Sequence, residues 1–241
     1  GGGVRDARRL LGDEAFLLLN GDAFLSIDLG ELLRAHFARG DAATMAVAPM
    51  PPNETFGGVE TGDELEVRRF SSHADADPAH ARWHFLGVHV ISPAVFDFIP
   101  PTGEQDINRG VYLAMVRAGL KVRVWPMRIG AWADMGSPRR YLQAAQDLLS
   151  GLCDLTALGP HAPLSPEQLA SHRGVPPSQR RLVLPGALVD GSAVLEESIV
   201  SPGVSVGANA VVRRSVVLAR TAVAEGEELV DTLASGALRL S

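Results

Sequence analysis

The last quarter of the chain carries an aliphatic residue at every sixth position, and this spacing restricts the fold more than any other feature. The nine positions, eight of them Leu or Val, are Leu182, Leu188, Val194, Val200, Val206, Val212, Leu218, Ala224 and Val230. On a helix, steps of six would scatter these side chains over three faces, whereas on extended chain they all point to one side. The spacing predicts a parallel β-helix over residues 182–241, with three hexads to a coil and roughly three stacked coils.

The residues between these positions favour a coil over a flat sheet. Small side chains, which let the chain turn a corner, stand four residues after most of the aliphatic ones, as at Gly186, Ser192, Ser198, Ala210 and Ala222. A β-sandwich would need turn signals at intervals of about 8–12 residues, and the segment lacks them. Because a terminal coil exposes an apolar end, we expect homo-oligomerisation through the coils.

Composition and charge exclude several classes of protein. Of the 241 residues 46% are apolar, and no apolar run approaches the roughly 20 residues that span a bilayer. No membrane partner is expected, and the absence of a signal-peptide pattern predicts a cytoplasmic location. A net charge of −6 and scattered arginine pairs argue against nucleic-acid binding. A single cysteine, Cys153, excludes an intrachain disulfide.

Near the other end of the chain, an apolar run at residues 16–19 stops abruptly at Asn20, Gly21 and Asp22. The run predicts a strand buried on both faces, as in a parallel sheet. The polar residues would then lie at the carboxyl end of that strand, where ligands bind in open α/β sheets. The same three residues also form a good turn, and alone they do not separate the two interpretations.

A second carboxylate, Asp134, stands in the glycine-rich stretch 130–138 just before a helix that Ser137 and Pro138 should begin. Two carboxylates at one sheet edge suit Mg²⁺, which completes its shell with water and substrate phosphate. Asp134 could equally be an ordinary helix-start residue.

Between these stretches, helices and strands alternate, which predicts parallel pairing of the strands at 16–19 and 44–48. The expected elements are helices over 4–12, 28–40, 92–99, 106–119 and 137–151, strands at 44–48, 83–91 and 122–125, and a hairpin over 56–70. Residues 152–181 contain five prolines and are expected to be a linker, with one domain over 1–151 before it and the coil over 182–241 after it.

Five motifs, in this order, resemble the sugar-1-phosphate nucleotidylyltransferases, whose mannose-1-phosphate guanylyltransferase-like members carry a carboxyl-terminal left-handed β-helix. The motifs are Leu-Asn-Gly-Asp (19–22), Phe-Gly-Gly-Val-Glu (56–60), Phe-Leu-Gly-Val-His-Val (85–90), Asp-Ile with Val-Tyr (106–107 and 111–112), and Gly-Ala-Trp-Ala-Asp-Met-Gly-Ser-Pro (130–138). The resemblance implies an α/β fold with a Rossmann-like sheet. It also implies that an NTP and a sugar 1-phosphate are joined with release of pyrophosphate and with Mg²⁺ as cofactor.

The resemblance also implies roles for individual residues. Asp22 and Asp134 match the catalytic metal ligands of the family. The substrate-binding positions implied are Gly1, Gly2 and Gly3 as the tail of the loop that contacts the base, Asn20 and Gly21, Gly57 and Glu60 beside the sugar pocket, and Gly87.

The chain departs from the family pattern in two places. It begins downstream of the Gly-x-Gly-Thr-Arg loop that holds the triphosphate, so we expect a truncated form that is inactive as it stands. The usual sugar-phosphate lysine is replaced around His73. These departures favour one alternative, a catalytically silent homologue that binds a nucleotide sugar or a partner subunit. Another alternative, a hexapeptide acyltransferase, is disfavoured because residues 182–241 contain no histidine.

Overall fold

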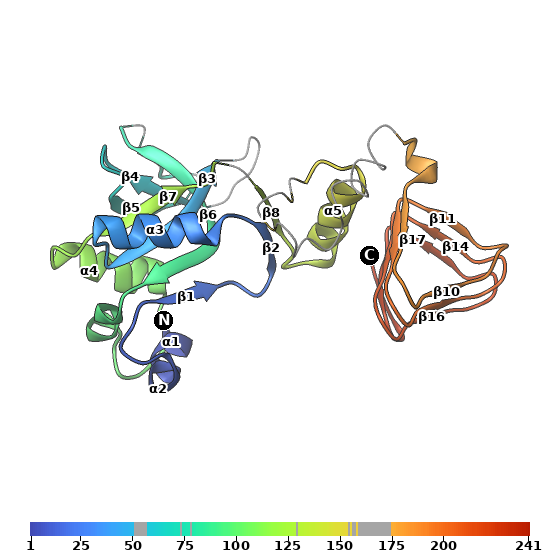
Figure 1. Ribbon diagram of the computed structural model, residues 1–241, viewed down its shortest axis with the longest axis horizontal. Coiled ribbons are helices and arrows are strands. Elements are labelled where there is room, and N and C mark those ends of the chain that lie inside the picture. Colours follow the sequence, from blue (N-terminus) through green and yellow to red (C-terminus); the bar gives the residue numbers. More distant parts are fainter. Residues whose placement is uncertain are drawn as a thin grey trace. The chain divides into compact units, whose positions relative to one another are not determined.

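The computed structural model describes residues 1–50, 57–72, 74–77, 79–128, 130–153, 155, 158 and 175–241. It divides into two compact units (Figure 1). The first unit contains residues 1–21 and 28–128, and the second contains residues 22–27 and 129–241. This grouping by contacts differs from the boundaries at 151 and 181 expected from the sequence, which stay predictions. Phe56 and His73 and most of the expected linker lie outside the described residues.

A mixed sheet forms the centre of the first unit. Across the sheet its described strands are β5 (Val67–Ser71), β4 (Gly58–Thr61), β6 (Ala81–Ile91), β3 (Ala43–Pro49) and β7 (Val122–Pro126), with β1 (Phe16–Leu19) also paired to β6. Strands β3 and β7 are parallel, and the other pairings are antiparallel. The hairpin expected over 56–70 is β4 and β5.

The expected direct pairing of the first strand with the strand at 44–48 is wrong. Ile91 of β6 faces both Phe16 of β1 and Ala43 of β3, so β6 separates two strands that run parallel to each other. The expectation that β1 is buried on both faces is also wrong, since its residues are half-buried and Leu19 is 46% exposed. β1 pairs with the last four residues of β6.

The helices of the first unit begin and end where capping residues stand. Helix α3 (Leu29–Arg39) starts at Asp28, whose carboxylate accepts from the amide of Glu31, and ends at Gly40 in the left-handed region. Asp106 likewise caps a π-helical turn (Ile107–Tyr112) that leads into α4 (Leu113–Arg117). Residues Pro93–Phe98 form a 3₁₀ helix.

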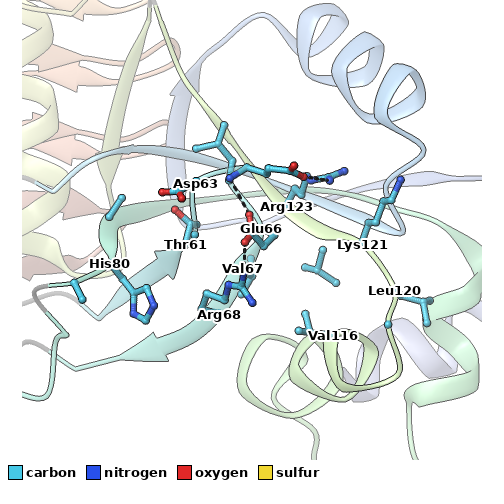
Figure 2. Close-up of a pocket in the computed structure, with 17 residues that line it drawn as sticks. Thr61, Asp63, Glu66, Val67, Arg68, His80, Val116, Leu120, Lys121 and Arg123 are labelled. Carbon is cyan, nitrogen blue, oxygen red and sulfur yellow. Dashed lines mark hydrogen bonds and ion pairs between the residues drawn. The ribbon is translucent and has the colours of Figure 1, made fainter.

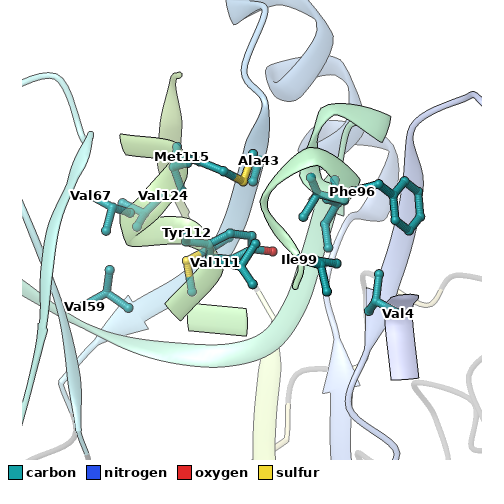
Figure 3. Close-up of a cluster of buried hydrophobic side chains, with 14 of the residues drawn as sticks. Val4, Ala43, Val59, Val67, Phe96, Ile99, Val111, Tyr112, Met115 and Val124 are labelled. Atoms are coloured by element: carbon teal, nitrogen blue, oxygen red, sulfur yellow. The ribbon is translucent and has the colours of Figure 1, made fainter. Parts of the chain in front are cut away.

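The core of this unit is mainly aliphatic (Figure 3). Side chains from β3, β4, β5 and β7 meet those of the Asp106-capped segment, among them Val59, Val124 and Met115. Tyr112 is fully buried there, and its hydroxyl lies 2.9 Å from Nδ1 of His89. Burial lowers the pKa of His89 to about 3, so the ring is neutral.

The second unit begins with an antiparallel ladder that the sequence did not reveal. β2 (Ala23–Ser26) pairs with β8 (Ala131–Asp134), so the stretch expected to be a compact turn is partly a strand. Helix α5 (Pro138–Leu149) follows, with Ser137 as its capping residue, as expected. Its apolar face, including Tyr141 and Ala145, packs on Val216 and Leu233 of the coil.

Residues 181–241 form a parallel β-helix whose strands line three faces (Figure 1). The faces contain β10 (Leu188–Val189), β13 (Ser205–Val206) and β16 (Ala222–Val223); β11 (Val194–Glu196), β14 (Val211–Arg213) and β17 (Glu228–Val230); and β9 (Arg181–Val183), β12 (Ser198–Val200), β15 (Val216–Val217), β18 (Leu233–Ser235) and the antiparallel β19 (Leu238–Leu240). The parallel coil confirms the expected fold, and its left-handedness stays a prediction.

The coils are one residue shorter than three hexads. Residues that stack on one another are 17 apart, as with Leu195, Val212 and Leu229. The uninterrupted step of six is therefore wrong as a description of the core: Leu188 and Val194 are 72% and 40% exposed. Three of the expected positions, Val200, Val206 and Val212, do lie in the buried core. Its other members are Leu195, Val204, Ala210, Val217, Val223, Leu229 and Ala234.

Each coil is one residue shorter than three hexads because one of its corners contains one residue fewer. There Glu197, Arg214 and Asp231 adopt positive φ angles of 45–49°. The next residue in each coil carries a hydroxyl, and the first two of these, Ser198 and Ser215, are fully buried. Ser215 Oγ donates to the Arg213 carbonyl and accepts from the Thr232 amide of the following coil. Buried backbone groups at this tight corner are thus satisfied by side chains.

Candidate functional site

The two aspartates singled out by the sequence lie side by side in the second unit. Asp134 is the last residue of β8 and faces Ala23, the residue after Asp22. The amide of Met135 donates to the Asp22 carbonyl at 2.8 Å, which extends the ladder by one more bond. Over a hundred residues of chain separate the two carboxylates, and the β2–β8 pairing brings them together.

Gly136 shows how closely the carboxylates approach. An ideal Cβ built on this glycine would lie 3.1 Å from Oδ1 of Asp134 and 3.4 Å from Oδ2 of Asp22. Both carboxylates therefore border the small space that the absent side chain leaves. The Gly136 amide also donates to Asp134 Oδ1 at 2.7 Å, which fixes the orientation of that carboxylate.

The first turn of α5 adds positive charge to the same place. The amide of Arg140 donates to Ser137 Oγ, which starts the helix beside Asp134. The Arg140 guanidinium forms an ion pair with Oδ2 of Asp134. Sequence reasoning missed Arg140, whose only signal was its position in the first turn after the Ser-Pro pair.

The residues present fit a hard divalent cation. Among the described residues, no group of three or more His, Cys, Asp or Glu has metal-binding geometry, which leaves a pair of carboxylates. One or two carboxylates, with water and substrate phosphate, are the usual ligand set of Mg²⁺. The space that a Cβ on Gly136 would fill lies against both carboxylates. Asp22 and Asp134 would hold the ion there.

In the first unit, Asn20 and Gly87 are neighbours. The amide of Asn20 donates to the Gly87 carbonyl at 2.8 Å. Gly87 has a φ of +79°, and a Cβ on it would lie 2.9 Å from Cβ of Asn20. Glycine is therefore required at 87 so that the loop after β1 can pass close to β6. Gly21 is exposed with open space beside it.

Gly57 lines a cavity of about 210 Å³ in the first unit. Two other residues that line it, Asn108 and Arg109, belong to the segment that Asp106 caps. Oδ1 of Asn108 is buried without a hydrogen-bond partner among the described residues. A buried acceptor at a cavity marks a place for a ligand or water donor. Sequence reasoning missed Asn108 because an asparagine in a helical turn does not by itself indicate a binding site.

Glu60 lies in β4 but is not among the residues that line this cavity. Its side chain is fully buried, forms an ion pair with Arg69 at 3.4 Å and lies 3.5 Å from Nδ1 of His80. The amide of Asp77 donates to its other oxygen at 3.1 Å. Glu60 therefore ties the end of the hairpin to the segment that precedes β6.

Gly1, Gly2 and Gly3 do not form the expected loop. Gly2 starts helix α1 (Gly2–Asp6), which continues into α2 (Arg8–Leu11). The amino group of Gly1 donates to the Gln105 carbonyl at 2.7 Å. Glycine is permissive rather than loop-forming, and packing of Val4 in the core stabilises the helix.

A larger cavity of about 1090 Å³ lies between the hairpin β4–β5 and the end of α4 (Figure 2). Several of its charged side chains pair with each other or with neighbours. Arg68 bonds Glu66, while Arg123 bonds Asp41 at 2.8 Å and Glu64 at 3.2 Å. The Asp41 carboxylate raises the pKa of Arg123. None of the described residues that the sequence singled out lines this cavity.

More than half of the chain, including both aspartates, matches the model of a known protein family. Residues 2–151 match the family model described as nucleotidyl transferase, so the chain belongs to that family. In the part of the chain that the structure describes, no helix is both long and apolar enough to cross a membrane.

The curated proteins that are similar in sequence include several that are named as sugar-1-phosphate nucleotidylyltransferases. A mannose-1-phosphate guanylyltransferase of Mycobacterium tuberculosis is 29% identical over 195 residues, or 81% of this chain and 51% of the relative. A UTP–glucose-1-phosphate uridylyltransferase of Synechocystis is 28% identical over 57% of this chain and 36% of the relative. A probable glucose-1-phosphate cytidylyltransferase of Bacillus subtilis is 33% identical over 42% of this chain and 37% of the relative. The chain thus spans about half the length of these relatives or less.

Proposed function

We propose that this chain belongs to an enzyme that joins an NTP to a sugar 1-phosphate and releases pyrophosphate. The observation that carries the proposal is the meeting of Asp22 and Asp134 around Gly136. Relatives named for guanylyl, uridylyl and cytidylyl transfer to or from sugar 1-phosphates support the reaction class. Because these relatives differ in the nucleotide, the proposal leaves the base open.

In this reaction the protein must position the two substrates and neutralise the negative charge of their phosphates. In such a transfer the sugar phosphate oxygen attacks the α-phosphorus in line, and pyrophosphate leaves. A Mg²⁺ ion held by Asp22 and Asp134 would neutralise charge on the phosphates. The amide groups at the start of α5 add positive potential beside Asp134. No covalent enzyme intermediate is needed.

The cavity beside Gly57 is the proposed place for the sugar 1-phosphate. Arg109 there supplies a cation for the phosphate, and Asn108 supplies a buried acceptor for a sugar hydroxyl. Its volume of about 210 Å³ suits a small polar ligand. Glu60 is proposed to support this region through its ion pair with Arg69 rather than to contact the sugar.

The test is pyrophosphate release, measured for the protein as expressed from its gene with Mg²⁺ and panels of NTPs and sugar 1-phosphates. Asp22→Asn and Asp134→Asn should each lower kcat by at least about 100-fold, as expected for loss of a group that stabilises transition-state charge. Asp63→Asn is the matched control, because Asp63 is an exposed carboxylate of the hairpin turn. Equal activity in all four proteins would contradict the proposal.

We further propose that a homo-oligomer forms through the first coil. Val183, Leu188 and Val194 are 41%, 72% and 40% exposed on its strands β9, β10 and β11, which are edges of the three faces. Exposed aliphatic edges of this kind favour association. Light scattering should show a dimer or larger at micromolar concentration, and Leu188→Glu should shift it towards monomer. A monomeric wild-type protein would contradict this proposal.

A further inference from the structure

The Asp134 carboxylate already has a cationic partner in this protein, the guanidinium of Arg140. The ion pair joins Arg140 Nη1 to Asp134 Oδ2, and the side chains are 48% and 24% exposed. Asp134 Oδ1 accepts from the Gly136 amide at 2.7 Å. Both oxygens of this proposed metal ligand therefore have partners within the protein.

Arg140 is held near Asp134 by the helix that carries it. Its amide is bound to Ser137 Oγ in the first turn of α5, and Pro138 stands at the start of that helix. The backbone of Arg140 is thus fixed beside Asp134, while its long side chain is half-exposed. Arg140 pairs with Oδ2 of Asp134, whereas the space at Gly136 lies beside Oδ1. A guanidinium and a divalent cation on the two oxygens of one carboxylate repel each other, so each weakens the binding of the other.

We propose that Arg140 is an internal counter-ion of the metal site, which occupies Asp134 when the metal is absent and must be displaced when the metal binds. This inference depends on the proposed function, because it takes Asp22 and Asp134 as the metal ligands. Arg140 is a positioning residue that sets metal affinity through Asp134. The displaced guanidinium is then available, on the same turn of α5, to phosphate oxygens that arrive with the metal.

The test is Mn²⁺ binding to the full chain, measured by electron paramagnetic resonance of free Mn²⁺. Arg140→Gln should bind Mn²⁺ about fivefold more tightly than wild type, the size expected for removal of a partly exposed ion pair. Arg139→Gln is the matched control, because it removes the same charge from the neighbouring exposed residue. It should change the affinity by less than about twofold.

A second readout separates competition at Asp134 from a general change in stability. In thermal unfolding, saturating Mn²⁺ should raise the Tm of Arg140→Gln more than that of wild type, because the variant has no ion pair to lose. Unchanged or weaker Mn²⁺ binding in Arg140→Gln, or an equal gain in Arg139→Gln, would overturn the inference. If wild type binds Mn²⁺ no better than Asp22→Asn, the proposed metal site itself fails, and this inference fails with it.

Discussion

At the scale of single residues, the candidate site depends on a glycine, Gly136, because a side chain at that position would fill the space between the two carboxylates. Gly136 is exposed, and its φ is not positive, so alanine would be tolerated by the backbone. Its importance lies in the space between Asp22 and Asp134, which a Cβ would enter. A Cβ at 3.1 Å from Asp134 Oδ1 is tighter than ordinary van der Waals contact and would push the carboxylate aside.

Gly136→Ala should therefore fold normally and weaken Mn²⁺ binding by about tenfold, from overpacking that costs roughly 1–3 kcal/mol. Mn²⁺ titration and circular dichroism would measure the two effects. Gly191→Ala is the control, because no atom lies within 4 Å of its ideal Cβ. Full Mn²⁺ affinity in Gly136→Ala would show that the metal does not lie between these carboxylates.

A second residue-scale prediction concerns His89, whose buried ring is neutral. Burial lowers its pKa from 6.5 in the unfolded chain to about 3 in the fold. The unfolded chain therefore binds a proton more readily, and stability that is fully present above pH 6.5 should be lost as pH falls towards 3. The contribution of His89 to the slope approaches about 1.4 kcal/mol per pH unit in this window.

Urea unfolding of wild type and His89→Gln across pH 4–7 measures this effect. At pH 7 the variant should be less stable, since it loses the ring that contacts Phe85 and Tyr112. The difference should shrink as pH falls, because only wild type loses the His89 contribution. Parallel stability curves for the two proteins would show that His89 does not titrate on unfolding.

At the scale of elements, the structure shows which patterns suffice for a prediction. Helices α3 and α5 were predictable because Asp28, Gly40 and Ser137 are local signals that act within one turn. β2 and β8 were not predictable, since each has four residues and depends on a partner over a hundred residues away. The proximity of Asp22 and Asp134 was expected from the resemblance, and the ladder supplies its physical cause.

The coil shows the opposite case, in which a pattern was seen but its period was misjudged. Apolar residues are so frequent there that steps of six fit through the whole segment, although the stacked residues are 17 apart. The residues with positive φ at the corners are Glu197, Arg214 and Asp231 rather than glycines, so the usual sequence signal of a positive φ is absent there. Their signal is the recurring pair of a charged residue and a hydroxyl residue, as in Arg214 and Ser215.

Ser215→Ala tests the hydroxyl at this corner. The change leaves the Thr232 amide without the acceptor that it has at 3.0 Å, so unfolding free energy should fall by about 1–3 kcal/mol. Ser205→Ala is the control, because Ser205 is exposed on β13. Chemical denaturation would measure both variants. Equal stability of the two would show that the corner does not need its side-chain hydrogen bonds.

At the scale of the whole molecule, the two aspartates and the coil belong to the same compact unit, while the mixed sheet forms the other. The chain enters the second unit at residue 22, returns to the first unit at residue 28 and enters the second again at residue 129, so it passes three times between units. The order of motifs along the sequence does not reveal such a crossing. Asp22 directly follows Gly21 in the chain, yet the contacts assign the two residues to different units.

The central claim is that Asp22 and Asp134 bind one divalent cation. Anomalous scattering from crystals grown with Mn²⁺ and a nucleotide tests it most directly. We expect one manganese peak within about 2.0–2.3 Å of a carboxylate oxygen of each aspartate, with Arg140 turned away from Asp134. A manganese peak bound elsewhere, or a nucleotide complex in which Arg140 still contacts Asp134 and no metal lies beside it, would contradict the account.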